Sequence, residues 1–210
     1  IRDLVAYAAQ RHITIVPEID MPAHSAAALA AYPHLACVPG EFKVLNPCHG
    51  IPDVYCPGKP STFEFIEAVL TEVMELFPSP VIHIGGDECN KTRWKSCPHC
   101  QAVIQREGLS DEDALQSWFT GRIAVFLRSK GRRLMGWNEI MRGGQLPKDA
   151  IVHQWNDERA AVEATRAGND VVVSCATWAY FDHGWDAASV KSLFDGLKAR
   201  GIDATGWGYG

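Results

Sequence analysis

Residues 81–90 read VIHIGGDECN, a short apolar run that ends in two glycines and two adjacent carboxylates, Asp87 and Glu88. An apolar run of this length is typical of a buried strand. Gly85 and Gly86 allow the backbone to turn sharply where the strand stops. Two neighbouring like charges repel each other and are costly to remove from water, so stability does not explain the pair. The pair indicates chemistry at the carboxyl end of a strand.

The chain around this segment alternates between helical and strand patterns. We expect strands at 13–17, 81–84, 132–137, 150–155 and 170–175, with a sixth near 202–206. Alternation of this kind, with apolar strands buried on both faces, predicts an α/β fold in which a parallel sheet is wrapped by helices. The candidate residues follow strand ends, as in a (β/α)8 TIM barrel, although an open doubly wound sheet uses the same end. The absence of a glycine-rich phosphate loop after the first strand disfavours nucleotide binding.

Helices are predicted between these strands. Their expected ranges are 2–11, 25–32, 61–77, 113–130, 157–167 and 187–200. Ser61 and Glu64 have the spacing of a capping box at the start of the third helix. Residues 33–60 and the stretch from 85 to 100 show little periodicity and are expected to be irregular loops.

Composition and charge narrow the class of protein. The chain has 210 residues, a formal net charge of −5 and no basic run, so nucleic acid is not an expected partner. No apolar segment approaches the ~20 residues of a membrane-spanning helix. The sequence opens at Ile1 within an amphipathic pattern, and we expect a piece of a longer protein whose compartment is not readable from this segment. Its 1–210 span is interpreted as one catalytic-domain fragment.

Cysteine usage leaves several interpretations open. The odd number of cysteines, seven, means that at least one is free or pairs between chains. Cys97-Pro-His-Cys100 has the spacing of half a zinc site, but no second such pair follows. Cys37, Cys48 and Cys56 fall in one loop and could form a local disulfide, which spacing alone does not show. We expect neither a metal nor a cofactor.

Several motifs together resemble glycoside hydrolase family 20, the β-N-acetylhexosaminidases. They occur in matching order over about residues 1–182 and read VPEIDMPAHS, HIGGDE, TRWKSCPHCQ, GRRLMGWNEI and YFD. The resemblance implies a (β/α)8 TIM barrel, here with about five or six of eight strands. It also implies a retaining exo-β-N-acetylhexosaminidase that removes terminal N-acetylglucosamine or N-acetylgalactosamine from glycans or glycoconjugates. The usual settings of the family are secreted, periplasmic or lysosomal.

The resemblance implies roles for the residues of the first two motifs. Asp87 would orient the 2-acetamido group of the substrate, whose carbonyl oxygen attacks the anomeric carbon and forms an oxazolinium intermediate. Glu88 would protonate the leaving oxygen and then activate water. Such substrate assistance is an exception to the usual scheme of two enzyme carboxylates. His24 would lie near the acid-base Glu88 and would tune its pKa or position it, and Asp20 and His24 are both expected to bind substrate. His83, on the strand before the glycines, is interpreted as a buried supporting residue.

The later motifs imply a pocket for the sugar. Trp137 and Trp155 match tryptophans around the acetamido group, and Tyr180 and Asp182 match residues that bind the acetamido oxygen and a sugar hydroxyl. Glu139 is interpreted either as a structural hydrogen-bond acceptor or as a substrate contact.

The chain also departs from the family pattern. The family's sugar-binding Arg on the first strand and the acidic residue after the second strand have no counterpart in this sequence. Trp207 matches a tryptophan of the last strand only weakly, because Tyr209 stands where a Glu is usual. Three hypotheses follow: the enzyme, a non-catalytic carbohydrate-binding or inactive fragment on the same fold, and a zinc-binding module built on Cys97 and Cys100.

Overall fold

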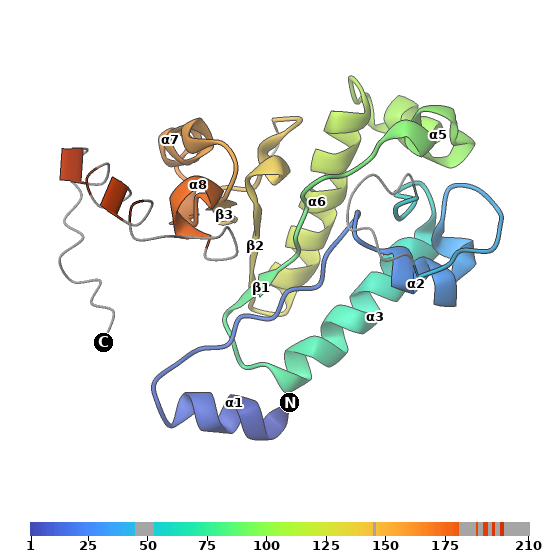
Figure 1. Cartoon of the computed structure of the whole chain (residues 1–210). Coiled ribbons are helices and arrows are strands. Elements are labelled where there is room, and N and C mark those ends of the chain that lie inside the picture. Colours follow the sequence, from blue (N-terminus) through green and yellow to red (C-terminus); the bar gives the residue numbers. More distant parts are fainter. Residues whose placement is uncertain are drawn as a thin grey trace.

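The computed structural model describes residues 1–44, 53–144 and 146–180, with isolated positions between 188 and 199. Four strands form one parallel sheet in the order β1-β2-β3-β4. Their ranges are β1 Val81–His83, β2 Arg133–Trp137, β3 Ile151–Gln154 and β4 Asp170–Val173. Each strand lies beside the one that precedes it in the chain, without the reversal that marks an open doubly wound sheet. Figure 1 shows α3 and α6 near β1 and β2, and α7 near β3.

The prediction of a regular strand at 13–17 was wrong. The chain is extended there, but it pairs with β1 only through an isolated bridge between Glu18 and His83. Backbone hydrogen bonds of 3.0 Å join Ile19 to His83 and His83 to Pro17, and Met21 bonds to Ile84. Proline has no amide hydrogen, so Pro17 can accept but cannot continue a ladder. The sixth strand expected near 202–206 lies outside the described residues.

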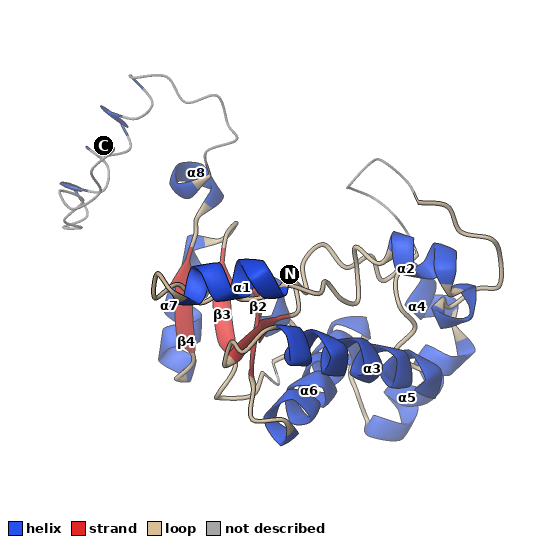
Figure 2. Ribbon diagram, turned by 90° about the horizontal axis from the view of Figure 1, so that it is seen from below, coloured by secondary structure: helices blue, strands red, loops and turns tan. Residues whose placement is uncertain are grey.

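Helices connect and cover the strands. The longer ones are α1 Arg2–Ala9, α3 Pro60–Leu76, α5 Pro98–Glu107, α6 Glu112–Ser129 and α7 Glu158–Ala167. Shorter turns are α2 Ala26–Ala31, the 3-10 helices Pro33–Leu35 and Asn138–Met141, α4 Thr92–Ser96 and α8 Ala176–Ala179. Figure 2 separates the strands from the helices around them. The helix expected at 187–200 falls largely outside the described residues.

Two local predictions were wrong because prolines begin helices earlier than expected. Pro60 is the first residue of α3, so Ser61 lies inside the helix and no side chain caps its start. Proline suits this position because its ring already holds a helical φ and its missing N–H has no partner to lose. Pro98 begins α5 in the same way, inside a stretch that was expected to be irregular.

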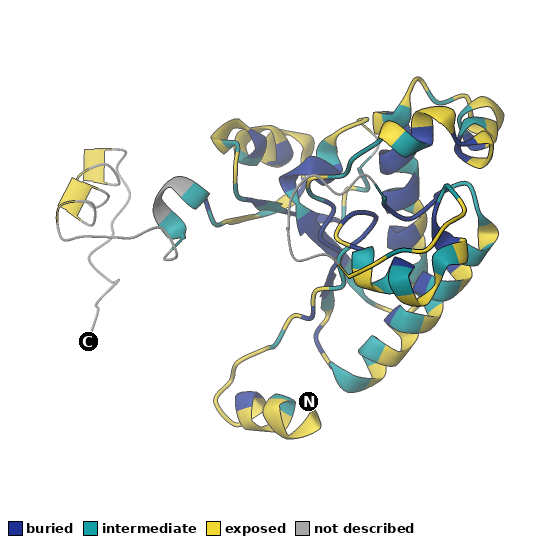
Figure 3. Cartoon of the chain, turned by 45° about the vertical axis from the view of Figure 1, so that its right-hand side comes forward, coloured by how far each residue is buried: buried dark blue, intermediate teal, exposed yellow. Residues whose placement is uncertain are grey.

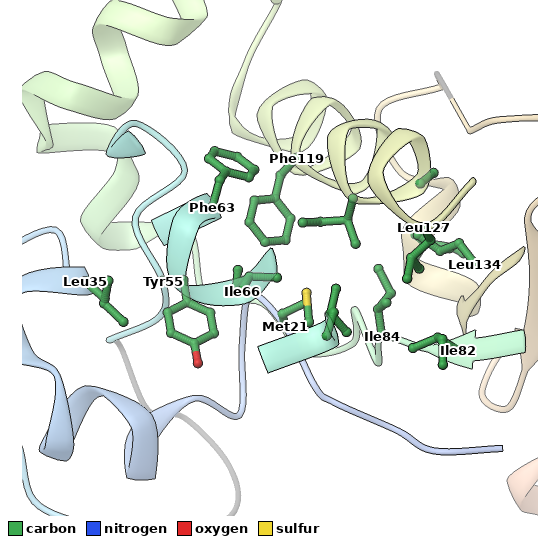
Figure 4. Packing of buried hydrophobic residues seen from close by; sticks show 14 of the residues in the cluster. Met21, Leu35, Tyr55, Phe63, Ile66, Ile82, Ile84, Phe119, Leu127 and Leu134 are labelled. Atoms are coloured by element: carbon green, nitrogen blue, oxygen red, sulfur yellow. The ribbon is translucent and has the colours of Figure 1, made fainter. Parts of the chain in front are cut away.

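The main core lies between β1, β2 and the helices α3 and α6. Met21, Leu70, Ile82, Ile84 and Phe119 are almost fully buried in it, as Figure 4 shows for most of this cluster. Burying each large aliphatic side chain contributes about 1.5–3 kcal/mol, so this cluster fixes the position of β1. The expectation of burial on both faces fails at β4, whose Val172 and Val173 are 40% and 50% exposed. The exposed surfaces of β4 and α1 are visible in Figure 3.

Candidate active site

The backbone turns at two glycines just beyond β1. Gly85 and Gly86 have φ values of +66° and +97°, a region that residues with a side chain rarely adopt. A Cβ on Gly85 would lie 1.8 Å from Asp20 Oδ1, and one on Gly86 would lie 2.5 Å from Ile140 Cγ2. The buried amide of Gln116, on α6, donates to the Gly86 carbonyl at 2.7 Å. The glycines therefore provide both the turn and the space that Asp20 occupies.

The turn brings three carboxyl groups and one imidazole together. His24 Nε2 lies 3.3 Å from Asp87 Oδ2 and 3.6 Å from Glu88 Oε2. Asp20 Oδ1 accepts a hydrogen bond of 3.3 Å from the Gly86 amide. His24 and Glu88 both have a φ of +49°, a strained backbone that is concentrated at functional sites. The clustering predicted for Asp20, His24, Asp87 and Glu88 is thus present in the structure.

Burial dominates the ionisation of two of these carboxyl groups. Desolvation, followed by the nearby charge of Asp87, raises the pKa of Asp20 to about 8. Desolvation also raises the pKa of Asp87, against opposing effects of its own amide and of His24. Asp87 Oδ1 is buried and has no hydrogen-bond partner. A buried acceptor without a partner lowers the stability of a protein by about 1–3 kcal/mol. A ligand that donates a hydrogen bond to Asp87 Oδ1 would remove this cost.

The raised pKa of Asp20 predicts a pH-dependent stability. The unfolded carboxyl ionises near 3.8 and the folded one near 8, so the folded chain retains a proton that the unfolded chain has released. Stability should therefore fall as pH rises through this window. Asp20→Asn is expected to increase the free energy of unfolding on the order of 2 kcal/mol at the upper end of the window and not near its lower end. Urea unfolding across the window measures this, and parallel profiles for the two proteins would contradict it.

Aromatic side chains form one wall beside the carboxyl cluster. Trp137 ends β2 and Trp155 follows β3, with ring centroids 6.4 Å apart at 66°. Tyr180 lies nearly parallel to Trp155, also at 6.4 Å. Trp137 stacks in turn on His153, at 4.2 Å and 26°. Aromatic faces of this kind bury the apolar faces of a ligand and leave its polar edges accessible.

Glu18 belongs to this wall, although it was not among the residues expected at the site. Its Oε1 accepts a 2.9 Å hydrogen bond from the indole of Trp137, which fixes the plane of the ring. The motif VPEID contains both Glu18 and Asp20, but only Asp20 was singled out as a candidate. The alternation of side chains past Pro17 was the available signal, since residues two apart on an extended chain share a face.

His83 has the supporting role that was expected. It is buried, and its Nδ1 accepts a 3.0 Å hydrogen bond from the Gly85 amide. Nδ1 also lies 3.3 Å from a Glu18 oxygen. One nitrogen cannot accept from an amide and donate to a carboxylate at once, and the fixed amide donor identifies it as the acceptor. Nε2 then donates to His153 at 3.2 Å, and His153 contacts Ser174 at 2.8 Å.

Glu139 makes the hydrogen bonds that a structural role requires, and its expected contact with substrate stays a prediction. It is buried, and its two carboxyl oxygens accept from Trp155 Nε1 at 3.0 Å and from the Asn156 amide at 2.8 Å. Asn138 completes this network through its bonds to Asn156 and to the Trp155 backbone. Neither Asn138 nor Asn156 was singled out from the sequence. Glu139 thus orients the Trp155 ring.

Glu139→Gln is expected to destabilise the chain by about 1–3 kcal/mol, because the new amide group faces a donor that it cannot satisfy. Thermal unfolding measures the loss. Glu163→Gln, an exposed change of the same chemistry on α7, should shift stability by less than about 0.5 kcal/mol. Equal effects of the two substitutions would show that the buried network contributes nothing.

Two of the expected site residues, Asp182 and Trp207, lie outside the described residues. Arg93 and Trp94 have the packing and ion-pair roles that are usual for such side chains. Arg93 pairs with Asp53 at 2.9 Å, and the fully buried Trp94 donates to the Tyr55 carbonyl. Among the helices described here, none is long and apolar enough to cross a membrane.

The parallel strands, the carboxyl pair at a strand end and the aromatic wall define the class of a glycoside hydrolase catalytic domain. The family model "Glycosyl hydrolase family 20, catalytic domain" matches residues 1–197, and the chain belongs to this family.

Individual relatives agree. A β-hexosaminidase of Porphyromonas gingivalis is 47% identical over 184 residues, which cover 87% of this chain and 24% of that protein. The crystal structure of a β-N-acetylhexosaminidase from Bacteroides fragilis superimposes with a TM-score of 0.78 at 39% identity, over 85% of this chain and 36% of the other. A Vibrio harveyi exo-β-N-acetylglucosaminidase in complex with N-acetylglucosamine has a TM-score of 0.77 at 39% identity, over 86% and 28%.

These matches bear on the fold as well. The four-stranded parallel α/β sheet corresponds to part of the TIM-barrel catalytic domain of the family. The chain spans about a quarter to a third of the length of these relatives.

Proposed function

We propose that this chain carries the acid-base centre of a retaining exo-β-N-acetylhexosaminidase that works by substrate-assisted catalysis. The observation that carries the proposal is the cluster of Asp87, Glu88 and His24 beyond β1, beside the tryptophan wall. The relative that is printed as bound to N-acetylglucosamine supports the choice of sugar. On this proposal residues 1–210 form part of a single (β/α)8 catalytic domain.

Asp87 is proposed to hold the acetamido group of the substrate. Its buried Oδ1 has no partner, and an acetamido N–H is the donor that would satisfy it. The acetamido carbonyl oxygen then attacks the anomeric carbon, and positive charge develops on the amide nitrogen. A carboxylate held against that nitrogen stabilises this charge, and the contact strengthens as the transition state forms.

Glu88 is proposed to transfer protons at the glycosidic oxygen. It donates its proton to the leaving group and later removes one from the water that opens the oxazolinium ring. His24, within 3.6 Å of both acidic side chains, positions them relative to each other. A mostly protonated Asp20 limits the negative charge of the cluster at neutral pH, since its pKa is raised to about 8.

Trp137, Trp155 and Tyr180 are proposed to enclose the acetamido methyl and one face of the sugar. The nearly parallel rings of Trp155 and Tyr180 and the inclined ring of Trp137 present apolar surface from neighbouring strand ends. Asp182 is proposed, on the family resemblance, to bind a sugar hydroxyl.

The proposal is tested by hydrolysis of an aryl N-acetyl-β-glucosaminide, with the corresponding β-glucoside as the control substrate. We expect turnover of the acetamido substrate alone. Asp87→Asn should lower kcat by about 10²–10³-fold, since an electrostatic contact to the reacting group is lost. Asp3→Asn, an exposed change on α1, should leave kcat unchanged.

Two outcomes would contradict the proposal. Equal hydrolysis of the glucoside would exclude substrate assistance. A folded chain that binds N-acetylglucosamine without hydrolysing the glycoside would identify a carbohydrate-binding module instead.

A further inference from the structure

Four cysteines from two distant segments meet in a second, smaller cluster of buried side chains around Trp94. Cys37 and Cys56 flank an antiparallel bridge between Ala36 and Tyr55, while Cys97 and Cys100 lie at the start of α5. All four sulfur atoms lie within 4.8 Å of one another. Three of these thiols are at most 3% exposed, and Cys37 is half-buried.

The distances between the sulfur atoms discriminate between the chemistries open to such a cluster. The separations are 3.7 Å for Cys37 and Cys100, 3.7 Å for Cys56 and Cys97, and 3.6 Å for Cys56 and Cys100. A disulfide needs about 2.05 Å. Four thiolates at about 2.3 Å from a tetrahedral zinc ion are about 3.8 Å apart. The observed spacing is therefore that of a metal cage.

The segment that contains Cys56 packs closely against the segment that contains Cys97 and Cys100; these are called the two cysteine loops below. In the turn that follows Cys56, the Gly58 backbone approaches that of His99, so a Cβ at Gly58 would lie 2.2 Å from the His99 carbonyl carbon. Cys97 and Cys100 are separated by two residues, the spacing that allows both sulfurs of one turn to bind one ion. The sequence contains no second pair of cysteines with this spacing. In the structure, Cys37 and Cys56 supply the other two sulfur atoms.

A cationic side chain lies close to the cysteine cluster. Lys59 places its ammonium on the carbonyls of His34 and Ala36, directly before Cys37 in the chain. Thiolates rather than thiols are the ligands of metal ions.

We propose that Cys37, Cys56, Cys97 and Cys100 bind one structural zinc ion. Four protein ligands complete a tetrahedron and leave no position for water, which distinguishes a structural from a catalytic zinc site. Soft thiolate ligands in this geometry select zinc or iron over magnesium or calcium. The proposal departs from the expectation, drawn from the sequence, that the chain binds no metal.

The ion would join the loops that lead to and from the carboxyl cluster. The Tyr55 amide, next to Cys56, donates to the Pro22 carbonyl two residues before His24. Trp94, three residues before Cys97, donates to the Tyr55 carbonyl at 3.0 Å. Without the cross-link these loops would be held chiefly by hydrogen bonds and by the small apolar cluster around Trp94.

The test is the metal content of the 210-residue chain, purified in the presence of zinc and measured by elemental analysis and native mass spectrometry. We expect one zinc per chain, and we expect Cys56→Ser and Cys97→Ser to lose it. Cys175→Ser, at a buried thiol outside the cluster, should retain it. Removal of the ion with a chelator should lower Tm on the order of 10 °C, reversed by added zinc.

Cobalt substitution of the unmutated chain provides a readout that does not depend on the folding of the variants. The expected result is the visible and near-ultraviolet absorption of tetrahedral cobalt bound by thiolates. A folded chain that contains no zinc, whose cysteines are recovered as alkylatable thiols or as disulfides, would overturn the proposal. Stoichiometric iron in place of zinc would overturn the assignment of the ion.

Discussion

Replacing Glu88 by glutamine is expected to lower kcat on an aryl N-acetyl-β-glucosaminide by about 10²–10⁴-fold, the range that a positioned general acid contributes. Glutamine keeps the size of the side chain and one acceptor oxygen, but it cannot release a proton. The loss should be smaller for leaving groups that need little protonation. Steady-state kinetics with a series of aryl leaving groups measures both effects.

A matched substitution separates this effect from unfolding. Glu72→Gln makes the same chemical change on the exposed side of α3 and should leave kcat and Tm unchanged. If Glu88→Gln retained most of the activity at an unchanged Tm, Glu88 would not be the proton donor. The acid would then have to be sought among Asp20 and Asp87, which His24 and the Gly86 turn bring to the same place.

Gly58→Ala is expected to lower the free energy of unfolding by about 3 kcal/mol or more, the largest stability change that we anticipate for a single methyl group in this chain. The added Cβ would lie 2.2 Å from the His99 carbonyl carbon and 2.6 Å from the Cys100 amide nitrogen. Both are backbone atoms, so the overlap is not relieved by a side-chain rotation, and overpacking of this kind costs about 1–3 kcal/mol or more. Separation of the two cysteine loops adds to the cost.

Gly121→Ala is the matched control, because nothing lies within 4 Å of a Cβ at that position in α6. Alanine in a helix interior is favoured over glycine by about 1 kcal/mol, so this change should stabilise the chain slightly. At about 2–4 °C per kcal/mol for a chain of this size, Gly58→Ala should lower Tm by at least about 6 °C. A Tm unchanged by Gly58→Ala would show that the loops are not in the close contact described here.

The part of the site that was predictable from sequence is the part that depends on neighbours along the chain. Asp87 and Glu88 follow an apolar strand and two glycines, and that order alone places them beyond the end of β1. Trp137 and Trp155 end the next two strands, and because the carboxyl ends of parallel strands share one edge of a sheet, their proximity followed. The roles of Tyr180 and Asp182 came only from the resemblance to the family, since YFD carries no physical signal by itself.

Other features depend on groups that are distant in sequence. Glu18 and Trp137 are separated by 119 positions, and their hydrogen bond exists only because the extended segment runs beside β1. The hydrogen bonds that Glu139 accepts from Trp155 and Asn156 also join residues 16 and 17 positions apart. Two local signals predicted different starts for α3. Ser61 has the pattern of an N-cap, but the helix begins one residue earlier, at Pro60.

The sequence by itself determined the alternation of strands and helices, the position of the carboxyl pair and the family, because each is encoded in contiguous residues whose periodicity and chemistry act locally. Only the tertiary structure decided that Cys37 and Cys56 meet Cys97 and Cys100. The spacing of a metal site is a distance in space, and between loops some 40 to 60 residues apart that distance is set by the packing of the intervening helix and sheet.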